Sequence, residues 1–422
     1  MRSLFVLAIV GAALWGAPGA FAAGWCGTGE SSVDRPDATT GAQIHAVWAV
    51  AADGPDTFAT GAGKMADDLT SISAWWVGQD PTRTPRIDNA PFPAGTCADI
   101  SFVRLPQPAS ALVGSASTAL LTIENDLATT SFGNLFKKYV VYFDGPSVQD
   151  NVCGVSDENF SSGPTFSVVL LGGCPEIPTD EIAAHELLHG LGALPPGAPN
   201  ACTAANNPLG AISDSGHPCD SPLDVLYPVT NGTPLAQLVL DVNHDDYYGH
   251  SGSWDDLQDS AWLHQLAAPV IPLSVTIVGA GDVASVVPGV DCTSSCTTQW
   301  DGGTQTELLA QAARGKRFVG WTGACTGRVD CNVTLGSAIS VTATFGPTRI
   351  PVAVGRTGKG TVACTPKCSK TFAAGSRLTL RAVPAKGWRF ASWTGDCAKV
   401  RIATCRPQTD FHVSARAIFR RR

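Results

Sequence analysis

A pattern of cysteines and a tryptophan occurs twice in the last third of the chain, and it limits what this part can fold into. The stretches FVGWTGAC and FASWTGDC carry the pattern 72 residues apart. Runs that alternate apolar and polar residues, such as SVTATF and RLTLRAV, predict strands around them. A β unit of about 70 residues has a small core that usually needs covalent cross-links. We therefore expect two small β domains, over residues 273–347 and residues 350–422.

The cysteines indicate how these domains are cross-linked. The chain has 14 of them, which are expected to pair as disulfides in an oxidising compartment. None lies in a CxxC pair, so a zinc knuckle is a poor interpretation. We expect local pairs, although the spacing alone also allows crossed ones. The expected pairs are Cys292–Cys296 and Cys325–Cys331 in the first repeat, and Cys364–Cys368 and Cys397–Cys405 in the second.

The repeated sequence resembles a known bacterial module. The GWTG-C pattern, followed by a terminal strand that reads VTATF or VSARAIF, is similar to divergent internalin-type B-repeats. The resemblance covers residues 273–422. It implies small β-grasp-like modules of secreted and surface proteins, which act as spacers or in adhesion rather than in catalysis.

The first 23 residues, MRSLFVLAIVGAALWGAPGAFAA, have the pattern of a secretory signal. Arg2 precedes an apolar run, and the small-residue site AFA follows at residues 20–22. A membrane anchor is the poorer interpretation, because Gly16 and Pro18 interrupt the run and no later segment is apolar for long enough to span a bilayer. We expect a soluble protein that is secreted to the extracellular space.

Charge is distributed unevenly along the chain. Residues 351–422 contain 15 Lys and Arg but only 2 Asp and Glu, a net charge of +13, whereas the whole chain carries −8. Such a basic segment can bind anionic polymers, among them cell-surface wall polymers, acidic polysaccharide or nucleic acid, or it can be a solvated surface. The sequence contains no specific nucleic-acid motif.

The part before the repeats alternates strand and helix patterns. This order predicts an α+β domain over residues 24–265, joined to the repeats by a linker, LAAPVIP, at residues 266–272. The expected strands are residues 42–52, 99–105, 138–145 and 166–173, and the expected helices are residues 57–77 and 110–127, with a third helix after the last strand.

That third helix carries the sequence HELLH. His185 and His189 are four positions apart, so on a helix they lie on one face and can bind one metal ion. Glu186 between them can take a proton from a water molecule and deliver it to a leaving amine. The alternative is a helix whose histidines have no metal.

The longer stretch HELLHGLGALP resembles the metzincin pattern HExxHxxGxxH up to Gly192. Pro195 stands at the position of the third histidine, and Leu226 in DVLYP stands where metzincins have a turn methionine. The resemblance covers residues 40–265. It implies a zincin-like metallopeptidase domain with one catalytic zinc ion, and it leaves the third ligand to be found elsewhere.

His217 is the first candidate for that ligand. If Cys202 and Cys219 pair, they close a loop on the end of the metal helix, and this loop brings His217 back toward it. The alternative is that His217 is an ordinary loop histidine that binds no metal.

Asp245 is the rival third ligand, because DDYYG fits the DxxYG part of the aspzincin motif. In that arrangement Tyr247 or Tyr248 would donate a hydrogen bond to the oxyanion or contact substrate; the alternative is that each is simply packed or on the surface. The segment DVNHDD also resembles a calcium loop, but Asp246 stands where such a loop needs Gly.

Two functions are compatible with these patterns. The first is a secreted zinc endopeptidase that hydrolyses bonds of a protein or peptide substrate by a zinc-activated water, with Glu186 as general base and the repeats as a spacer or surface-binding module. The second is a non-catalytic zincin-like domain in a secreted adhesion or surface-binding repeat protein.

Overall fold

The computed structural model describes residues 25–160, 163–193, 197–210 and 214–422. The expected secretory signal and Pro195 lie outside them. Within the described ranges, no helix is long and apolar enough to cross a membrane. The chain is rich in β-structure and forms two compact units, one comprising the described residues up to Ala38 together with Ile44–Leu263, and the other Thr39–Gln43 and His264–Arg422.

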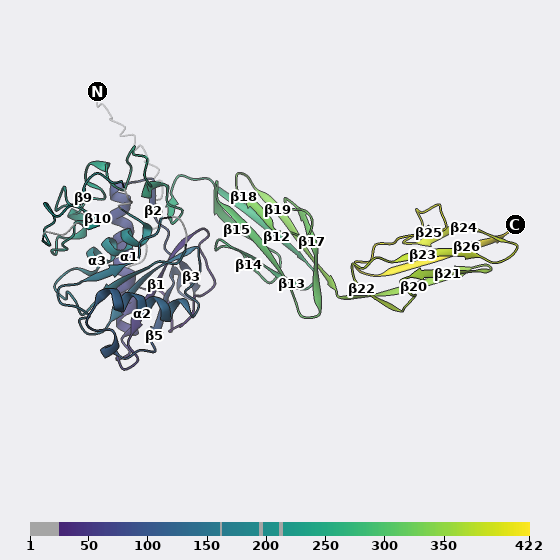
Figure 1. Cartoon of the computed structure of the whole chain (residues 1–422), viewed down its shortest axis with the longest axis horizontal. Coiled ribbons are helices and arrows are strands. Elements are labelled where there is room, and N and C mark those ends of the chain that lie inside the picture. The colour runs from purple at the N-terminus through teal and green to yellow at the C-terminus, as the bar shows by residue number, and fades with distance from the viewer. Residues whose placement is uncertain (1–24, 161–162, 194–196, 211–213) are drawn as a thin grey trace, which may run out of the picture. The chain divides into compact units, whose positions relative to one another are not determined.

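The first unit is built on a five-stranded mixed sheet (Figure 1). The strands lie in the order β5 (Ile100–Arg104), β1 (Gln43–Val50), β6 (Lys137–Asp144), β8 (Phe166–Leu170) and β7 (Gly154–Ser156). β1 runs parallel to β5 and β6 parallel to β8, whereas β7 pairs antiparallel with β8 at the edge. β1, β6 and β8 are buried along almost their whole length, as is typical of strands covered on both faces.

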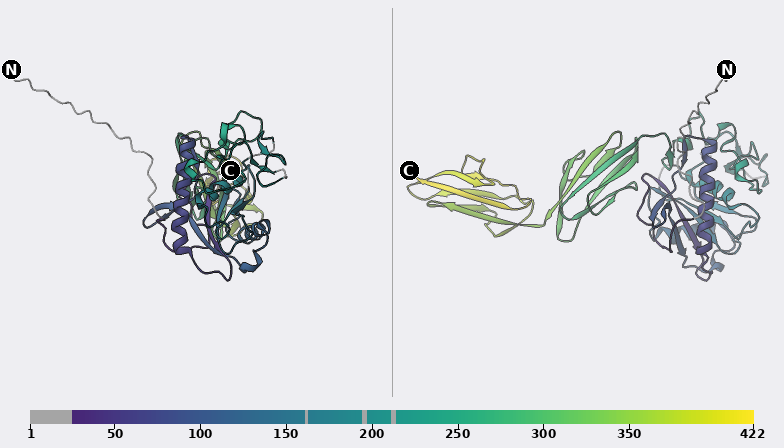
Figure 2. Two further views of the ribbon diagram at one scale, coloured as in Figure 1. Left: turned by 90° about the vertical axis from the view of Figure 1, so that its left-hand side faces the viewer. Right: turned by 180° about the vertical axis from the view of Figure 1, so that it is seen from behind.

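Three α-helices cover the sheet: α1 (Phe58–Gln79), α2 (Ala116–Ala128) and α3 (Thr179–Leu191). α2 packs into a core with Val141 and Val168 on one face. Successive side chains of a strand point to opposite faces, so Tyr142 points the other way, and its hydroxyl donates to Asp68 of α1. α1 therefore covers the second face, and it lies in front of the sheet in the view from behind (Figure 2). α3 packs against α1, β6, β7 and β8.

Shorter elements complete this unit. The strands are β2 (Arg83–Pro85), β3 (Asn89–Phe92), β4 (Gly95–Ala98), β9 (Ala201–Cys202), β10 (Asp214–Pro218) and β11 (Leu263–Gln265). The 3₁₀ helices are η1 (Ala109–Ala111), η2 (Leu235–Gln237), η3 (Val242–His244) and η4 (Leu257–Asp259).

The second unit consists of two all-β repeats (Figure 1). The first contains β12 (Val270–Val278), β13 (Gly281–Ser285), β14 (Asp291–Cys292), β15 (Cys296–Asp301), β16 (Gln305–Ala312), β17 (Lys316–Gly323), β18 (Cys331–Thr334) and β19 (Ile339–Pro347). The second contains β20 (Arg349–Thr357), β21 (Gly360–Thr365), β22 (Thr371–Ala373), β23 (Thr379–Pro384), β24 (Trp388–Gly395), β25 (Thr404–Cys405) and β26 (Val413–Arg421). In each repeat the first and last strands pair in parallel within one sheet, and a second, antiparallel sheet completes the fold.

The repeated motif has the same structural role in both copies. Trp321 and Trp393 are buried, and the four expected disulfides are present. Two sequence expectations need correction. No helix occurs in residues 273–422, all of which are described, so the repeats are two-sheet modules rather than β-grasp-like ones. The expected linker 266–272 is partly strand, because β12 already begins pairing with β15 at Val270.

A buried lysine fastens the N-terminal segment to the central sheet. The ammonium of Lys137 donates to Asp34, Asp37 and Asp88 over 2.6–2.8 Å. Three carboxylates around one buried cation leave an excess of negative charge, which protonation of a carboxyl relieves.

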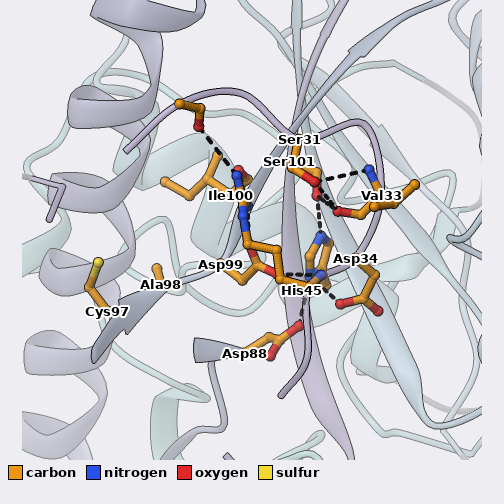
Figure 3. A network of polar contacts seen from close by, with 12 residues as sticks. Ser31, Val33, Asp34, His45, Asp88, Cys97, Ala98, Asp99, Ile100 and Ser101 are labelled. Atoms are coloured by element: carbon orange, nitrogen blue, oxygen red, sulfur yellow. Dashed lines mark hydrogen bonds and ion pairs between the residues drawn. The ribbon is translucent and has the colours of Figure 1, made fainter. Parts of the chain in front are cut away.

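His45 joins this network at the same oxygen of Asp88 that Lys137 contacts, and Figure 3 shows it between Asp88 and Ser101. Its Nδ1 lies 2.7 Å from Asp88 Oδ2, and its Nε2 lies 3.0 Å from Ser101 Oγ. The order Ser–His–Asp is that of a hydrolase triad, but all three residues are at most 1% exposed. Substrate cannot reach Ser101, so the network holds the fold rather than performing chemistry.

The network predicts how the stability of the first unit depends on pH. Burial raises the pKa of Asp34 and of Asp88 to about 6 and that of Asp37 to about 7. A carboxyl whose pKa is higher in the folded chain stabilises the fold at low pH, and this contribution is lost as the pH rises through the folded pKa. Buried His45, whose pKa is lowered, acts in the opposite sense but is one group against three. The melting temperature of the first unit should therefore fall between about pH 5 and pH 7.5, by calorimetry. Asp34→Asn with Asp37→Asn should reduce this slope, and a melting temperature that rises over the window would contradict the assignment.

Candidate metal centre

Helix α3 carries two histidines and a glutamate toward one point. Asp180 and Glu181 lie in its first turn, where acidic side chains interact favourably with the helix dipole. The helix ends at Gly192, whose φ of 89° is in the left-handed region and whose N–H donates to the carbonyl of His189. The helix thus stops just after the second histidine and frees the chain to turn away.

The segment after α3 returns a third histidine to the first two. Strand β10 carries His217 and pairs with β9, and the Cys202–Cys219 disulfide closes the loop between them. The Nε2 atoms of His185, His189 and His217 lie 3.2 Å from one another in all three pairs. The structure therefore brings His217 to the α3 pair, by the disulfide-closed loop that the sequence indicates.

Hydrogen bonding fixes which ring nitrogen of His185 carries the proton. Its Nδ1 lies 2.8 Å from the carbonyl oxygen of Val225, which can only accept, so Nδ1 is the donor and Nε2 keeps its lone pair. Burial and the two neighbouring imidazoles lower the pKa of His185 well below its ordinary value, which keeps the ring neutral. His189 Nδ1 lies 3.6 Å from the exposed carboxylate of Glu158.

The turn that supplies the Val225 carbonyl is itself held by a buried carboxylate. Asp224 accepts from the N–H of Leu226 at 2.8 Å and from the Tyr247 hydroxyl at 2.8 Å. Leu226 is fully buried at the position that the resemblance assigns to a methionine. DVLYP thus forms a packed turn below the histidines.

The three nitrogens fit a tetrahedral metal ion. Zinc binds imidazole at about 2.0–2.1 Å, which places tetrahedral ligand atoms about 3.3–3.4 Å apart, close to the 3.2 Å here. Hydrogen bonds among the three rings would satisfy these nitrogens poorly, because an N–H at one Nε2 can point to only one of the other two Nε2 atoms. A histidine whose Nδ1 donates to a carbonyl is also the usual metal-binding form. The donor set is therefore suited to zinc.

Glu186 lies beside the three histidines and is 7% exposed. Burial raises its pKa to about 7, against a smaller lowering effect of His189. Its side chain packs against Gly154 of β7, where a Cβ atom would overlap the carboxylate. Gly154 is a residue that the sequence patterns did not single out, because nothing local marks its contact with α3.

A pocket of about 590 Å³ opens over this group. His185, Glu186 and His217 lie in its wall, and residues 151–154 form another side of it. The Cys153–Cys174 disulfide, which was not expected from the sequence, joins that side to the segment before α3. The other unexpected pair, Cys26–Cys97, fastens the N-terminal segment.

Three expected site residues lie elsewhere. Asp245 clusters with Asp220 and Asp246 rather than with the histidines. The Tyr247 hydroxyl binds buried Asp224, and the Tyr248 hydroxyl donates to Asp80 over 2.7 Å. Both tyrosines are at most 2% exposed, so the expected oxyanion or substrate contact is replaced by a structural role. The DVNHDD segment is arranged around the carboxylate of Asp241, which accepts from backbone N–H groups of residues 245–248.

The two repeats match a known family. Residues 283–349 and 350–418 match the Divergent InlB B-repeat domain, which confirms the resemblance expected for this part of the chain. The match does not extend to the first unit, which holds the three-histidine group. No curated protein matches the chain.

Several solved structures show a faint likeness to the chain. OgpA from Akkermansia muciniphila is 10% identical, with 87% of this chain and 93% of that chain covered and a TM-score of 0.25. A catalytically inactive OgpA in complex with an O-glycopeptide gives the same identity and coverage and a TM-score of 0.26. The major pilin protein T-13 from Streptococcus pyogenes is 9% identical, with 37% of this chain and 98% of that chain covered and a TM-score of 0.14. TM-scores this low carry no conclusion about the fold or the function of the first unit.

The geometry predicts which residues bind zinc. Replacing His185, His189 or His217 with Ala should lower zinc affinity at least about 100-fold, because each removes one ligand of three. Asp245→Asn should leave it unchanged, since Asp245 lies in another cluster. Competition with a chromophoric chelator measures both. Loss of zinc in Asp245→Asn with retention in His217→Ala would reverse the assignment.

Proposed function

We propose that the first unit is a zinc-dependent endopeptidase that acts outside the cell. The observation that carries the proposal is the meeting of His185, His189 and His217 at one point, beside buried Glu186. The resemblance of HELLHGLG to metzincins supplies the reaction class. The seven disulfides and the B-repeats support an extracellular site of action.

The residues divide the chemistry between binding and proton transfer. The three imidazoles would hold zinc through Nε2. Zinc supplies Lewis acidity, which lowers the pKa of water and polarises a carbonyl group. Glu186 would take a proton from the attacking water and give it to the leaving nitrogen.

The edge of the sheet offers a place for an extended substrate. β7 is the last strand of its sheet, so one side of its backbone lacks a partner strand among the described residues. Gly154, the first residue of β7, lines the pocket together with the three residues before it, Asn151, Val152 and Cys153. A peptide that pairs with this edge would pass Glu186, which touches Gly154. We infer that the substrate binds as an added strand and is cut within its chain.

The first test is Glu186→Gln. The substitution keeps the shape of the side chain but cannot accept a proton, so cleavage of a fluorescently labelled unfolded protein should fall at least about 100-fold. Bound zinc, measured by elemental analysis, should stay at the wild-type level because the three histidines remain.

Glu176→Gln is the matched control, because Glu176 lies in the wall of the same pocket without touching the histidine group. It should keep activity. A wild-type protein that cleaves nothing would instead favour the non-catalytic zincin-like domain, and a protein that binds no zinc would contradict the proposed peptidase.

Gly154→Ala tests the contact between β7 and Glu186. The added Cβ would lie 2.7 Å from Glu186 Cδ, so the carboxylate must move. We expect kcat to fall about 10- to 100-fold, with zinc content and melting temperature nearly unchanged. Gly63→Ala in α1 is the control, because a Cβ there meets no atom within 4 Å. Equal activity in the two variants would show that the position of Glu186 is not critical.

A further inference from the structure

The second B-repeat carries cations that no acidic side chain neutralises. All residues of 351–422 are described, and none of their 15 Lys and Arg side chains forms an ion pair with a carboxylate. The two acidic residues are otherwise engaged. Asp396 accepts from the N–H of Ser414, and Asp410 binds Arg317 and Arg328 of the first repeat. The charge of this repeat is thus left to solvent or to a partner.

The first B-repeat shows that the fold itself does not need this charge. Over residues 273–347 it has 4 Lys and Arg against 5 Asp and Glu. Apart from the additional edge strand β14, its strands pair in the same order around the equivalent buried tryptophan. On the outward face of the central strand, Arg416 of the second repeat stands where the first repeat has Thr342. The cations are a feature of the surface of one copy.

Three chain segments bring part of this charge to one end of the second repeat. The turn between β20 and β21 meets the turn between β23 and β24, where the N–H of Ala385 donates to the carbonyl of Lys359. The C-terminus joins them, where the N–H of Arg422 donates to the carbonyl of Gly387. We call this end the basic tip. Its exposed cations are Lys359, Lys386, Arg389, Arg420, Arg421 and Arg422.

Two of these arginines face each other directly. Arg389 of β24 and Arg420 of β26 are register partners on adjacent antiparallel strands, and both are exposed. Like charges at directly opposite positions destabilise a sheet unless an anion lies between them. Paired guanidinium groups suit sulfate or phosphate groups, whose oxygens accept two parallel N–H bonds.

The surroundings of the tip distinguish among polyanions. Single-stranded nucleic acid is bound by aromatic side chains on which bases stack, but Trp388 is only partly exposed and Phe419 is buried. The repeat has no helix that could enter a major groove. Charge without stacking favours a polymer that is recognised through its anionic groups alone.

We propose that the basic tip of the second B-repeat binds an anionic polysaccharide that carries sulfate or phosphate groups. The binding anchors the secreted chain to a polysaccharide-coated surface. It does not depend on the metal centre, so it is tested separately from the proposed peptidase activity.

The experiment compares two variants of the full chain that lose the same charge. The tip variant replaces the six cations of the basic tip with Gln. The control variant replaces two lysines and four arginines that are exposed away from the tip: Lys370, Arg377, Arg381, Lys399, Arg401 and Arg406. Melting temperatures establish that both fold.

Binding is measured on immobilised heparin at 0.15 M salt, with hyaluronan, which has carboxylates only, and double-stranded DNA as competitors. The tip variant should bind at least about tenfold more weakly, with a shallower dependence on salt, whereas the control variant should change by less than about threefold. Heparin should compete better than hyaluronan or DNA. Equal losses of affinity in both variants would show that binding depends on overall charge and not on the basic tip. Stronger competition by DNA would assign the tip to nucleic acid. Either result would overturn the proposal, as would a wild-type chain that does not bind heparin.

Discussion

Three imidazole nitrogens 3.2 Å apart are the constraint on which the rest of the first unit depends. Two parts of the chain supply these histidines. His185 and His189 share a face of α3, which ends at Gly192 so that the chain can leave. His217 returns on a loop closed by the Cys202–Cys219 disulfide, and the carbonyl of Val225 orients the ring of His185 from below. The metal would therefore join segments that the fold has already brought together.

Buried carboxylates organise the irregular region that follows. Asp224 holds the turn below the histidines, and Asp241 accepts from the N–H groups of Asp246, Tyr247 and Tyr248 at 2.6–3.3 Å. These contacts satisfy backbone N–H groups that a neighbouring strand would satisfy in a regular sheet. A buried carboxylate whose oxygens accept backbone N–H groups is not available as a metal ligand. The acidic and aromatic residues here therefore support the site without taking part in it.

Local patterns allowed the parts of this structure to be predicted, but not the contacts between them. The spacing of His185 and His189 and the alternation of apolar and polar residues in the repeats are local features, so the helix and the strands could be predicted from them. His217 could be placed because two cysteines flanking its loop indicated a closed loop. The sequence left a catalytic or a packed role open for Tyr247 and Tyr248, because their partners, Asp224 and Asp80, are not apparent from the local pattern. Gly154 was missed for the same reason, since only the fold places it against Glu186.

The two B-repeats separate what the fold requires from what the surface adds. Both keep the buried tryptophan, the two disulfides and the parallel pairing of first and last strands, because a module this small has little other means of staying folded. None of these features involves Arg389, Arg416 or Arg420. Their charges repel one another and none of them is paired with a carboxylate, so we look for the reason for this charge outside the module. A fold shared by two copies thus says little about their partners, and the difference between the copies says more.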